Sequence, residues 1–141
     1  MKSFLCRVVL ATTVLLSGTF TYETLQQTHV SHAAVNYYSK NSCAWYVFNR
    51  RAQLGKPVSN QWGNAKHWVA NAKRAGYRVG RKPARHAVMQ SPKGRYGHVA
   101  VVEHVYRNGS IKVSEYNYNR PYSYGTRILS RATARQHHFI Y

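Results

Sequence analysis

Residues 97–117 read GHVAVVEHVYRNGSIKVSEYN, and this stretch decides the fold. Two runs rich in β-branched residues flank Asn108-Gly109, a dipeptide that strongly favours a tight hairpin turn. The pattern predicts two antiparallel strands, Gly97–Tyr106 and Ser110–Asn117, joined by a two-residue loop.

That loop length sets the register of the predicted hairpin. It places Ala100 opposite Asn117 and Val102 opposite Glu115. Because paired side chains share a face of a sheet, His98, Glu115 and Asn117 should project from the same side. Asn117 is then diagonal to His98 and is the better placed residue to orient its ring, with Glu115 farther along the strand as an alternative.

Helices are predicted before the hairpin, and further strands around it. Asn41 or Ser42 can cap a helix over residues 41–54, and Asn64 can cap a second helix over residues 65–75. Short apolar runs at 87–90, 127–129 and 138–141 read as strands. Helices followed by antiparallel strands indicate an α+β fold, a single domain with N-terminal helices packed on a small antiparallel sheet.

The N-terminus has the composition of an export signal. Lys2 and Arg7 are positive, and the uncharged, mostly apolar run from Val8 to Phe20 is too short to span a membrane. Small residues at Ser31-His32-Ala33 suit a cleavage site. We therefore expect a signal peptide over residues 1–33, a domain over residues 34–141, and a secreted, extracellular or wall-associated protein. An uncleaved N-terminal anchor is the alternative.

Export makes the cysteine count informative. Cys6 leaves with the leader, so the mature chain keeps only Cys43. An unpaired thiol in a secreted protein either forms an intermolecular disulfide or is reactive. Cys43 stands at the start of the first predicted helix, where the helix dipole and free N–H groups favour a thiolate. A nearby histidine such as His98 would complete a nucleophilic pair, with a third polar residue orienting the ring.

The charge balance limits the other classes of function. The chain has 21 Lys and Arg against three Glu, with no Asp and a net charge of +18. So few carboxylates disfavour calcium or magnesium sites and two-carboxylate sugar hydrolysis. The positive charge attracts polyanions. The basic residues are scattered, without a nucleic-acid signature, so wall polymers such as teichoic acids are favoured over specific nucleic-acid binding. No membrane span is expected in the mature chain.

Other interpretations of the same residues stay open. Cys43 could be a buried small apolar residue, or it could bind zinc with two histidines, although no zinc-motif spacing is present. The five other histidines of the predicted mature chain are interpreted as solvated or structural: His67, His86, His104, His137 and His138. By alternation Glu103 should face away from His98, as a surface residue or an ion-pairing residue.

Several motifs together resemble the CHAP domain, closest to the staphylococcal secretory-antigen type, over about residues 36–141. They are Asn41-Ser42-Cys43-Ala44-Trp45-Tyr46-Val47, Trp62-Gly63-Asn64-Ala65, Trp68, Gly76-Tyr77, Pro83, Gly97-His98-Val99-Ala100 and Glu115-Tyr116-Asn117-Tyr118. The resemblance implies a papain-like (NlpC/P60-type) fold that cleaves peptidoglycan, as an N-acetylmuramoyl-L-alanine amidase or an endopeptidase.

The resemblance also implies roles for individual residues. Cys43 matches the nucleophile, His98 the base, Glu115 the acidic third member and Asn117 a further polar residue of the site. Trp62, Gly63 and Asn64 match the groove wall of the family, and the other predicted substrate-groove residues are Trp45, Tyr46, Gly97 and Tyr116. His86 departs from the family pattern and would crowd or line the groove.

The resemblance implies no cofactor and no metal, and we expect a monomer. Two other classes of function stay open beside the thiol hydrolase. One is a catalytically weak, cationic wall-binding or antigen-like protein. The other is a cationic protein that binds nucleic acid or membranes.

Overall fold

A computed structural model of the chain describes residues 34–141. The predicted leader and its boundary at residue 33 lie outside the described residues. No helix within residues 34–141 has the length and apolar character to span a membrane. The elements, in chain order, are α1 (Cys43–Gln53), the 3₁₀ turn η1 (Ala65–His67), α2 (Trp68–Arg74), β1 (Val79–Gly80), β2 (Val88–Ser91), β3 (His98–Val105), β4 (Ile111–Tyr116), β5 (Tyr124–Leu129), α3 (Arg131–Ala134) and β6 (His138–Ile140).

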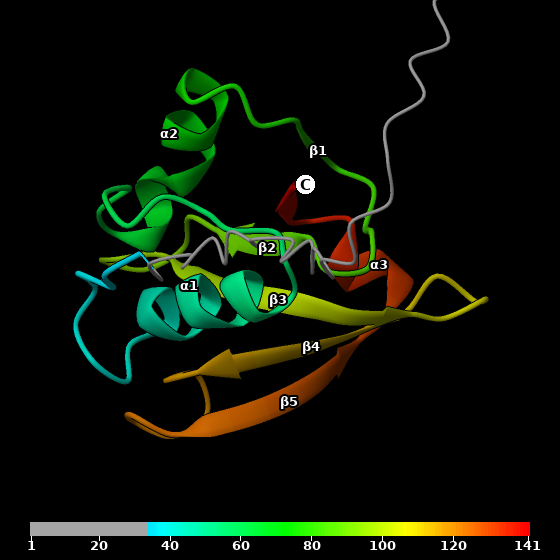
Figure 1. The fold of residues 1–141 in the computed structure, drawn as a ribbon. Coiled ribbons are helices and arrows are strands. Elements are labelled where there is room, and N and C mark those ends of the chain that lie inside the picture. Colours follow the sequence, from blue (N-terminus) through cyan, green and yellow to red (C-terminus); the bar gives the residue numbers. More distant parts are fainter. Residues whose placement is uncertain (1–33) are drawn as a thin grey trace, which may run out of the picture. The chain divides into compact units, whose positions relative to one another are not determined.

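The strands form one antiparallel sheet in the order β1-β6-β2-β3-β4-β5. The last strand within residues 34–141, β6, therefore lies between β1 and β2 rather than at an edge. In Figure 1 α1 lies across one face of the sheet, over β3, and the turn that joins β3 to β4 projects at the right-hand end of these two strands. The α+β prediction, with N-terminal helices packed on an antiparallel sheet, is confirmed.

Two apolar layers cover the two faces of β3. Val99 and Val101 pack into a core with Val47 and Phe48 of α1 and Trp68 of α2. The alternate residues Ala100 and Val102 pack into a second core with Ile111, Phe139 and Ala134. Because both faces are covered, β3 is rigid along its length, which suits a strand that holds a reactive side chain at one end.

The predicted helices form where their caps indicate. The side-chain oxygen of Ser42 accepts a hydrogen bond from the Trp45 N–H, so Ser42 is the N-cap of α1. The second helix begins as η1 after Asn64, whose side chain makes no capping bond. Trp68 and Ala72 are fully buried on the same face, as their spacing predicts. The short elements β1 and α3 had no signal in the sequence.

The predicted hairpin register is wrong by two residues. The loop has three residues, since Val105 pairs with Ile111 and the Tyr106 N–H bonds to the carbonyl of Ser110. Gly109 ends that loop with φ +85°, the left-handed conformation that closes three-residue hairpin loops. The ladder shifts once more at a bulge between Val102 and His104.

The shift of two residues leaves each side chain on its predicted face of the sheet but changes its cross-strand partner. Val102 pairs with Val113 rather than with Glu115. Continuing the ladder places Glu115 beside Ala100, in the position diagonal to His98 that was predicted for Asn117. An even shift preserves which side chains share a face, since side chains alternate with period two.

Candidate active site

Cys43 is the first residue of α1 and is partly buried. Its helix presents free donors at this end. The N–H of Trp45 bonds to the Ser42 side chain and that of Tyr46 to the Ser42 carbonyl. Within residues 34–141 the Cys43 N–H has no acceptor and the Ala44 N–H bonds to the Cys43 sulfur, so both can stabilise negative charge beside the thiol.

His98 begins β3, and Gly97 fixes where that strand starts. Gly97 has φ +73°, and a side chain there would fall 2.8 Å from the Cα of Lys66. The Lys66 N–H also donates to the Tyr96 carbonyl at 2.9 Å. The close approach of η1 to this loop therefore requires glycine, and it sets the position of the His98 ring.

The imidazole of His98 lies between an acid and a thiol. Its Nε2 is 2.8 Å from Oε2 of Glu115, which leaves Nδ1 for the hydrogen bond to Cys43. Glu115 is 2% exposed, so this carboxylate is removed from water. The histidine is thus held at one nitrogen while the other is available to exchange a proton with the thiol.

Arg127 of β5 neutralises the buried Glu115. Its Nε donates to Oε1 and its Nη2 donates to Oε2 at 3.0 Å, a bidentate pair. The guanidinium also stacks on Tyr118, with Cζ 3.4 Å from the ring centroid, and the Tyr118 ring lies 5.0 Å from that of His98. Burying a lone carboxylate is costly, so Arg127 allows Glu115 to stay ionised beside the histidine.

The surroundings shift the pKa values of the pair toward charge separation. Burial opposes the imidazolium, but hydrogen bonds to Cys43 and Glu115 and their charges raise the pKa of His98 to about 9. Burial likewise raises the pKa of Cys43, yet His98 and the backbone N–H groups of Val99 and Ala44 outweigh it and lower the pKa overall. The pKa of Glu115 is also lowered, because hydrogen bonds from His98 and Arg127 outweigh its burial.

This arrangement can support nucleophilic chemistry. A thiolate next to an imidazolium attacks an electrophilic carbon, and the imidazolium then supplies a proton to a leaving group. The free N–H groups at the start of α1 can hold the oxyanion that forms during the attack.

Asn117 does not orient the histidine. It is exposed, adopts φ +60°, and its side-chain oxygen accepts a hydrogen bond from the Tyr122 N–H. Its own N–H bonds to the Ser123 carbonyl. Asn117 therefore shapes the turn between β4 and β5, and the prediction that it is the better placed orienter is wrong.

Three of the predicted groove residues form a partly buried aromatic cluster on α1 and β4. The rings of Tyr46 and Tyr116 are stacked with centroids 5.2 Å apart, and Trp45 meets Tyr116 edge-on at 5.9 Å. Tyr124 of β5 completes the cluster at 5.7 Å from Tyr46. These rings offer a wall of apolar surface beside the first turn of α1.

The segment 62–64 is only partly as predicted. Trp62 is 4% exposed and packs edge-on against Trp68 and Tyr77, so its side chain belongs to the core and does not line a groove. Gly63 and Asn64 are exposed. The Gly63 carbonyl accepts a hydrogen bond from the Trp68 indole, which ties this exposed segment to α2.

His86 is distant from the pair and does not crowd it. It precedes β2, where its N–H bonds to the Val102 carbonyl and its carbonyl accepts from Arg51. The opposite end of β2 carries Ser91, the partner of His98. The expectation that His86 lines the groove is therefore wrong.

Glu103 behaves as predicted. Its carboxylate forms a bidentate pair with Arg50 of α1 and accepts a hydrogen bond from Ser114. It thus faces the side of β3 opposite to Ala100 and Val102. Among residues 34–141, no three His, Cys, Asp or Glu side chains are grouped closely enough to hold a metal ion.

Arg127 is the site residue that sequence reasoning missed. Its position in a predicted strand carried no functional signal. One signal was available: with two carboxylates in residues 34–141, a buried glutamate beside a histidine needs a basic partner. Which of the 19 Lys and Arg residues after residue 33 provides it depends on the pairing of β4 with β5, which places Arg127 opposite Val113.

The chain is similar to known proteins over most of the described region. The model of the CHAP domain family matches residues 33–117, which include Cys43, His98 and Glu115. A protein named probable autolysin SsaALP, from Staphylococcus aureus, is 45% identical over 107 residues, 75% of this chain and 40% of that protein. N-acetylmuramoyl-L-alanine amidase sle1 of Staphylococcus haemolyticus is 44% identical over 106 residues, 73% of this chain and 32% of that protein.

A solved structure shares the fold. The crystal structure of an N-acetylmuramoyl-L-alanine amidase from Staphylococcus aureus aligns with a TM-score of 0.69 and 36% identity, over 72% of this chain and 30% of that one. The chain therefore spans less than half the length of these relatives.

Proposed function

Because the chain belongs to the CHAP domain family, we propose that it is an exported thiol hydrolase of peptidoglycan amide bonds. The observation that carries the proposal is the contact of Cys43, at the start of a helix, with a histidine that is held by a buried glutamate. Residues 1–33 are proposed to be the export signal and residues 34–141 the hydrolase domain.

The proposed reaction has two steps. The Cys43 thiolate attacks the amide carbonyl carbon, and the N–H groups of Cys43 and Ala44 stabilise the oxyanion. His98 gives its proton to the leaving amine as the C–N bond breaks, which leaves a thioester on Cys43. Neutral His98 then takes a proton from water, the hydroxide adds to the thioester, and the carboxylic acid and the thiol are released.

Glu115 and Arg127 would assist without touching the substrate. Glu115 holds the tautomer and orientation of His98 and stabilises its positive charge during the first step. Arg127 keeps Glu115 ionised. The aromatic cluster of Trp45, Tyr46, Tyr116 and Tyr124 would carry the wall fragment beside the nucleophile.

The names of two relatives favour the amidase over the endopeptidase, since both are N-acetylmuramoyl-L-alanine amidases. We further propose that the net positive charge draws the protein to anionic wall polymers such as teichoic acids. Such attraction would retain the protein at the wall.

Digestion of purified peptidoglycan tests the proposal. The wild-type protein should clear a wall suspension and release new termini, and Cys43→Ala should do neither. Mass spectrometry of the released fragments identifies the bond: a lactyl carboxylate with a free L-alanine amine means an amidase, and a new amine within the peptide means an endopeptidase. Equal clearing by wild type and Cys43→Ala would contradict the thiol mechanism and would favour a cationic protein that acts by binding.

A further inference from the structure

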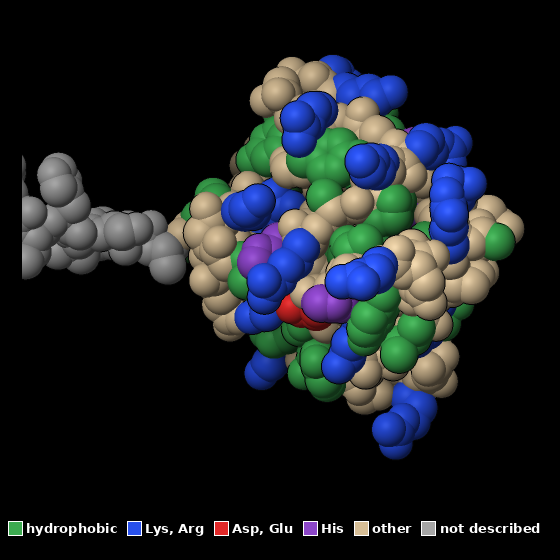
Figure 2. Space-filling view, turned by 90° about the vertical axis from the view of Figure 1, so that its right-hand side faces the viewer, with side chains coloured by type: hydrophobic (Ala, Val, Ile, Leu, Met, Phe, Trp, Pro, Cys, Tyr) green, Lys and Arg blue, Asp and Glu red, His purple; other side chains and the backbone are tan. Residues whose placement is uncertain are grey.

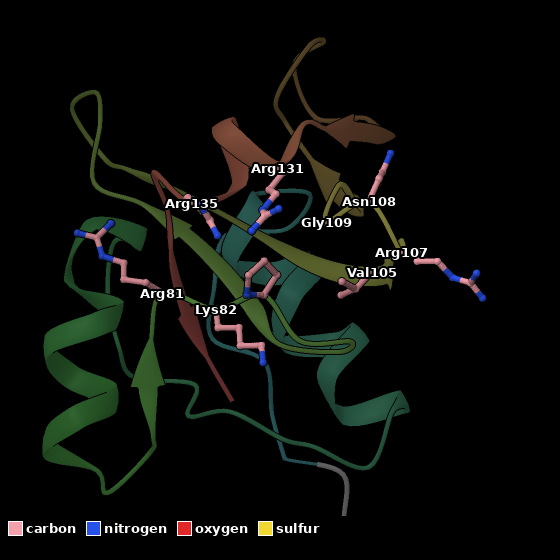
Figure 3. Close-up of a pocket in the computed structure, with 9 residues that line it drawn as sticks. Arg81, Lys82, Val105, Arg107, Asn108, Gly109, Arg131 and Arg135 are labelled. Carbon is pink, nitrogen blue, oxygen red and sulfur yellow. The ribbon is translucent and has the colours of Figure 1, made fainter.

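A second concave site lies at the end of β3 that is remote from His98. It is a cavity of about 690 Å³ between the loop after β1, the β3–β4 turn and α3. Five of its nine lining residues are basic, namely Arg81, Lys82, Arg107, Arg131 and Arg135, and none is acidic. In Figure 3 Arg131 and Arg135 reach over the middle of the cavity, with Lys82 below them and Arg81 and Arg107 at the sides.

Within residues 34–141 the five basic side chains have no carboxylate partner. The two glutamates in residues 34–141 are already paired, Glu103 with Arg50 and Glu115 with His98 and Arg127. The bonds of Arg81 go only to the carbonyls of Gln136 and His137. Figure 2 shows the face that carries the hairpin tip, where blue side chains spread across the surface and red appears in one small patch.

The position of Arg131 is fixed by the turn beneath it. Gly109 has φ +85°, and a side chain there would fall 2.8 Å from Cδ of Arg131. The aliphatic part of Arg131 therefore lies directly on the backbone of the turn. Arg131 begins α3 and Arg135, four residues later, is its C-cap, so their guanidinium groups occupy the same side of the cavity.

The lining indicates the chemistry of the ligand. Guanidinium groups bind phosphate oxygens with two parallel hydrogen bonds, and five positive charges around one cavity match several phosphates rather than a single carboxylate. Single-stranded nucleic acid is usually bound with aromatic rings on which the bases stack. No aromatic side chain lines this cavity; its apolar surface comes from Pro83 and Val105. A phosphodiester chain without bases fits these groups best.

We propose that this cavity binds successive phosphates of a linear polyol-phosphate polymer of the teichoic-acid type. This proposal rests on the proposed function, which places the protein at the cell wall. It assigns the attraction between protein and wall polymer to this cavity rather than to the overall net charge. Seven residue steps of β3 separate His98 from Val105. At about 3.3 Å per residue the two sites lie roughly 23 Å apart, so a polymer can occupy the cavity without blocking Cys43.

The test measures binding of a synthetic glycerol-phosphate oligomer to the Cys43→Ala protein by titration calorimetry at several salt concentrations. Arg131→Gln with Arg135→Gln should weaken binding about tenfold or more and flatten the salt dependence, because each lost phosphate contact removes about 0.7 from the logarithmic slope of a flexible polyanion. Lys73→Gln with Arg74→Gln, two exposed residues of α2, removes the same charge elsewhere and should change affinity less than about threefold.

Three results would overturn the proposal. The first is equal weakening by the two double variants, which would mean attraction by net charge alone. The second is equal or tighter binding of a single-stranded oligonucleotide of the same charge, lost in the same variant, which would identify a nucleic-acid site. The third is equal binding of polyglutamate. Cleavage of a short soluble muropeptide by the Arg131/Arg135 variant is measured separately, so a failure of the hydrolase proposal and a failure of the binding proposal are distinguishable.

Discussion

The charged side chains at the two ends of β3 are in opposite environments. At the His98 end an acid, a base and a thiol are buried together, and Arg127 completes the set. At the Val105 end five basic side chains surround a cavity without a carboxylate among them. Buried and paired charges fix geometry and pKa values, whereas exposed and unpaired charges attract a partner and respond to salt. The comparison predicts that the two ends can be disabled separately.

The largest effect is expected from His98→Ala. Loss of the imidazole that protonates the leaving amine in the proposed mechanism should lower kcat for a soluble muropeptide by about 10³-fold or more. Binding of the glycerol-phosphate oligomer should stay within about twofold of wild type, because the cavity lies at the other end of the strand. Activity within tenfold of wild type would remove His98 from the mechanism.

Arg127→Met should lower both the stability of the protein and the activity of the site at the His98 end of β3. It leaves the Glu115 carboxylate buried with only His98 beside it, so the free energy of unfolding should fall by about 3 kcal/mol. Misplacement of the ring should lower kcat by on the order of 100-fold. Chemical denaturation and steady-state kinetics provide the measurements, and Arg127→Lys, which keeps the charge, should recover part of both losses. A stable, fully active Arg127→Met protein would show that Glu115 does not depend on this arginine.

Gly97→Ala is expected to cause a smaller loss of stability, through backbone conformation and steric contact alone. The left-handed backbone and the clash with Lys66 should together cost about 2 kcal/mol. Gly94→Ala is the matched control, because Gly94 also has a positive φ but faces open space, so it should cost only about 1 kcal/mol. Thermal denaturation compares the two variants. Equal losses would mean that the approach of η1 does not constrain the start of β3.

The smallest effect is a displacement of the pH profile. The thiolate–imidazolium pair exists above the lowered pKa of Cys43 and disappears as pH rises through the His98 pKa of about 9. The alkaline limb of kcat/KM should therefore lie near pH 9. Glu115→Gln removes a group that raises the pKa of His98, so in that variant the limb should move to lower pH. A limb that stays in place would exclude Glu115 as the residue that tunes the ring.

The sequence predicted most of the elements that position the candidate site. Ser42 before an apolar helical pattern located the start of α1, and the strand patterns around Asn108-Gly109 located β3 and β4. The side of the sheet that carries His98 and Glu115 was also predicted. These features depend on local preferences of the backbone, which a single sequence contains.

The features that the sequence did not predict depend on contacts between distant segments. The loop contains three residues because Gly109 accepts a left-handed conformation at its end, and the bulge at Glu103 accompanies a pairing with Arg50, which is 53 residues away. Together those two shifts bring Glu115 into the position diagonal to His98 that was predicted for Asn117. Trp62 showed the same limit: its ring is buried by Trp68 and Tyr77, and nothing local distinguishes such a tryptophan from one that lines a groove.

The place of β6 in the sheet has a consequence for biogenesis. Residues 138–140 are synthesised after every other helix and strand of residues 34–141, yet they lie between β1 and β2 and pair with both. The sheet therefore cannot close until this final strand has left the ribosome. A chain threaded N-terminus first through an export channel would stay open during transit, and its thiol and histidine would meet in finished form only after release on the far side.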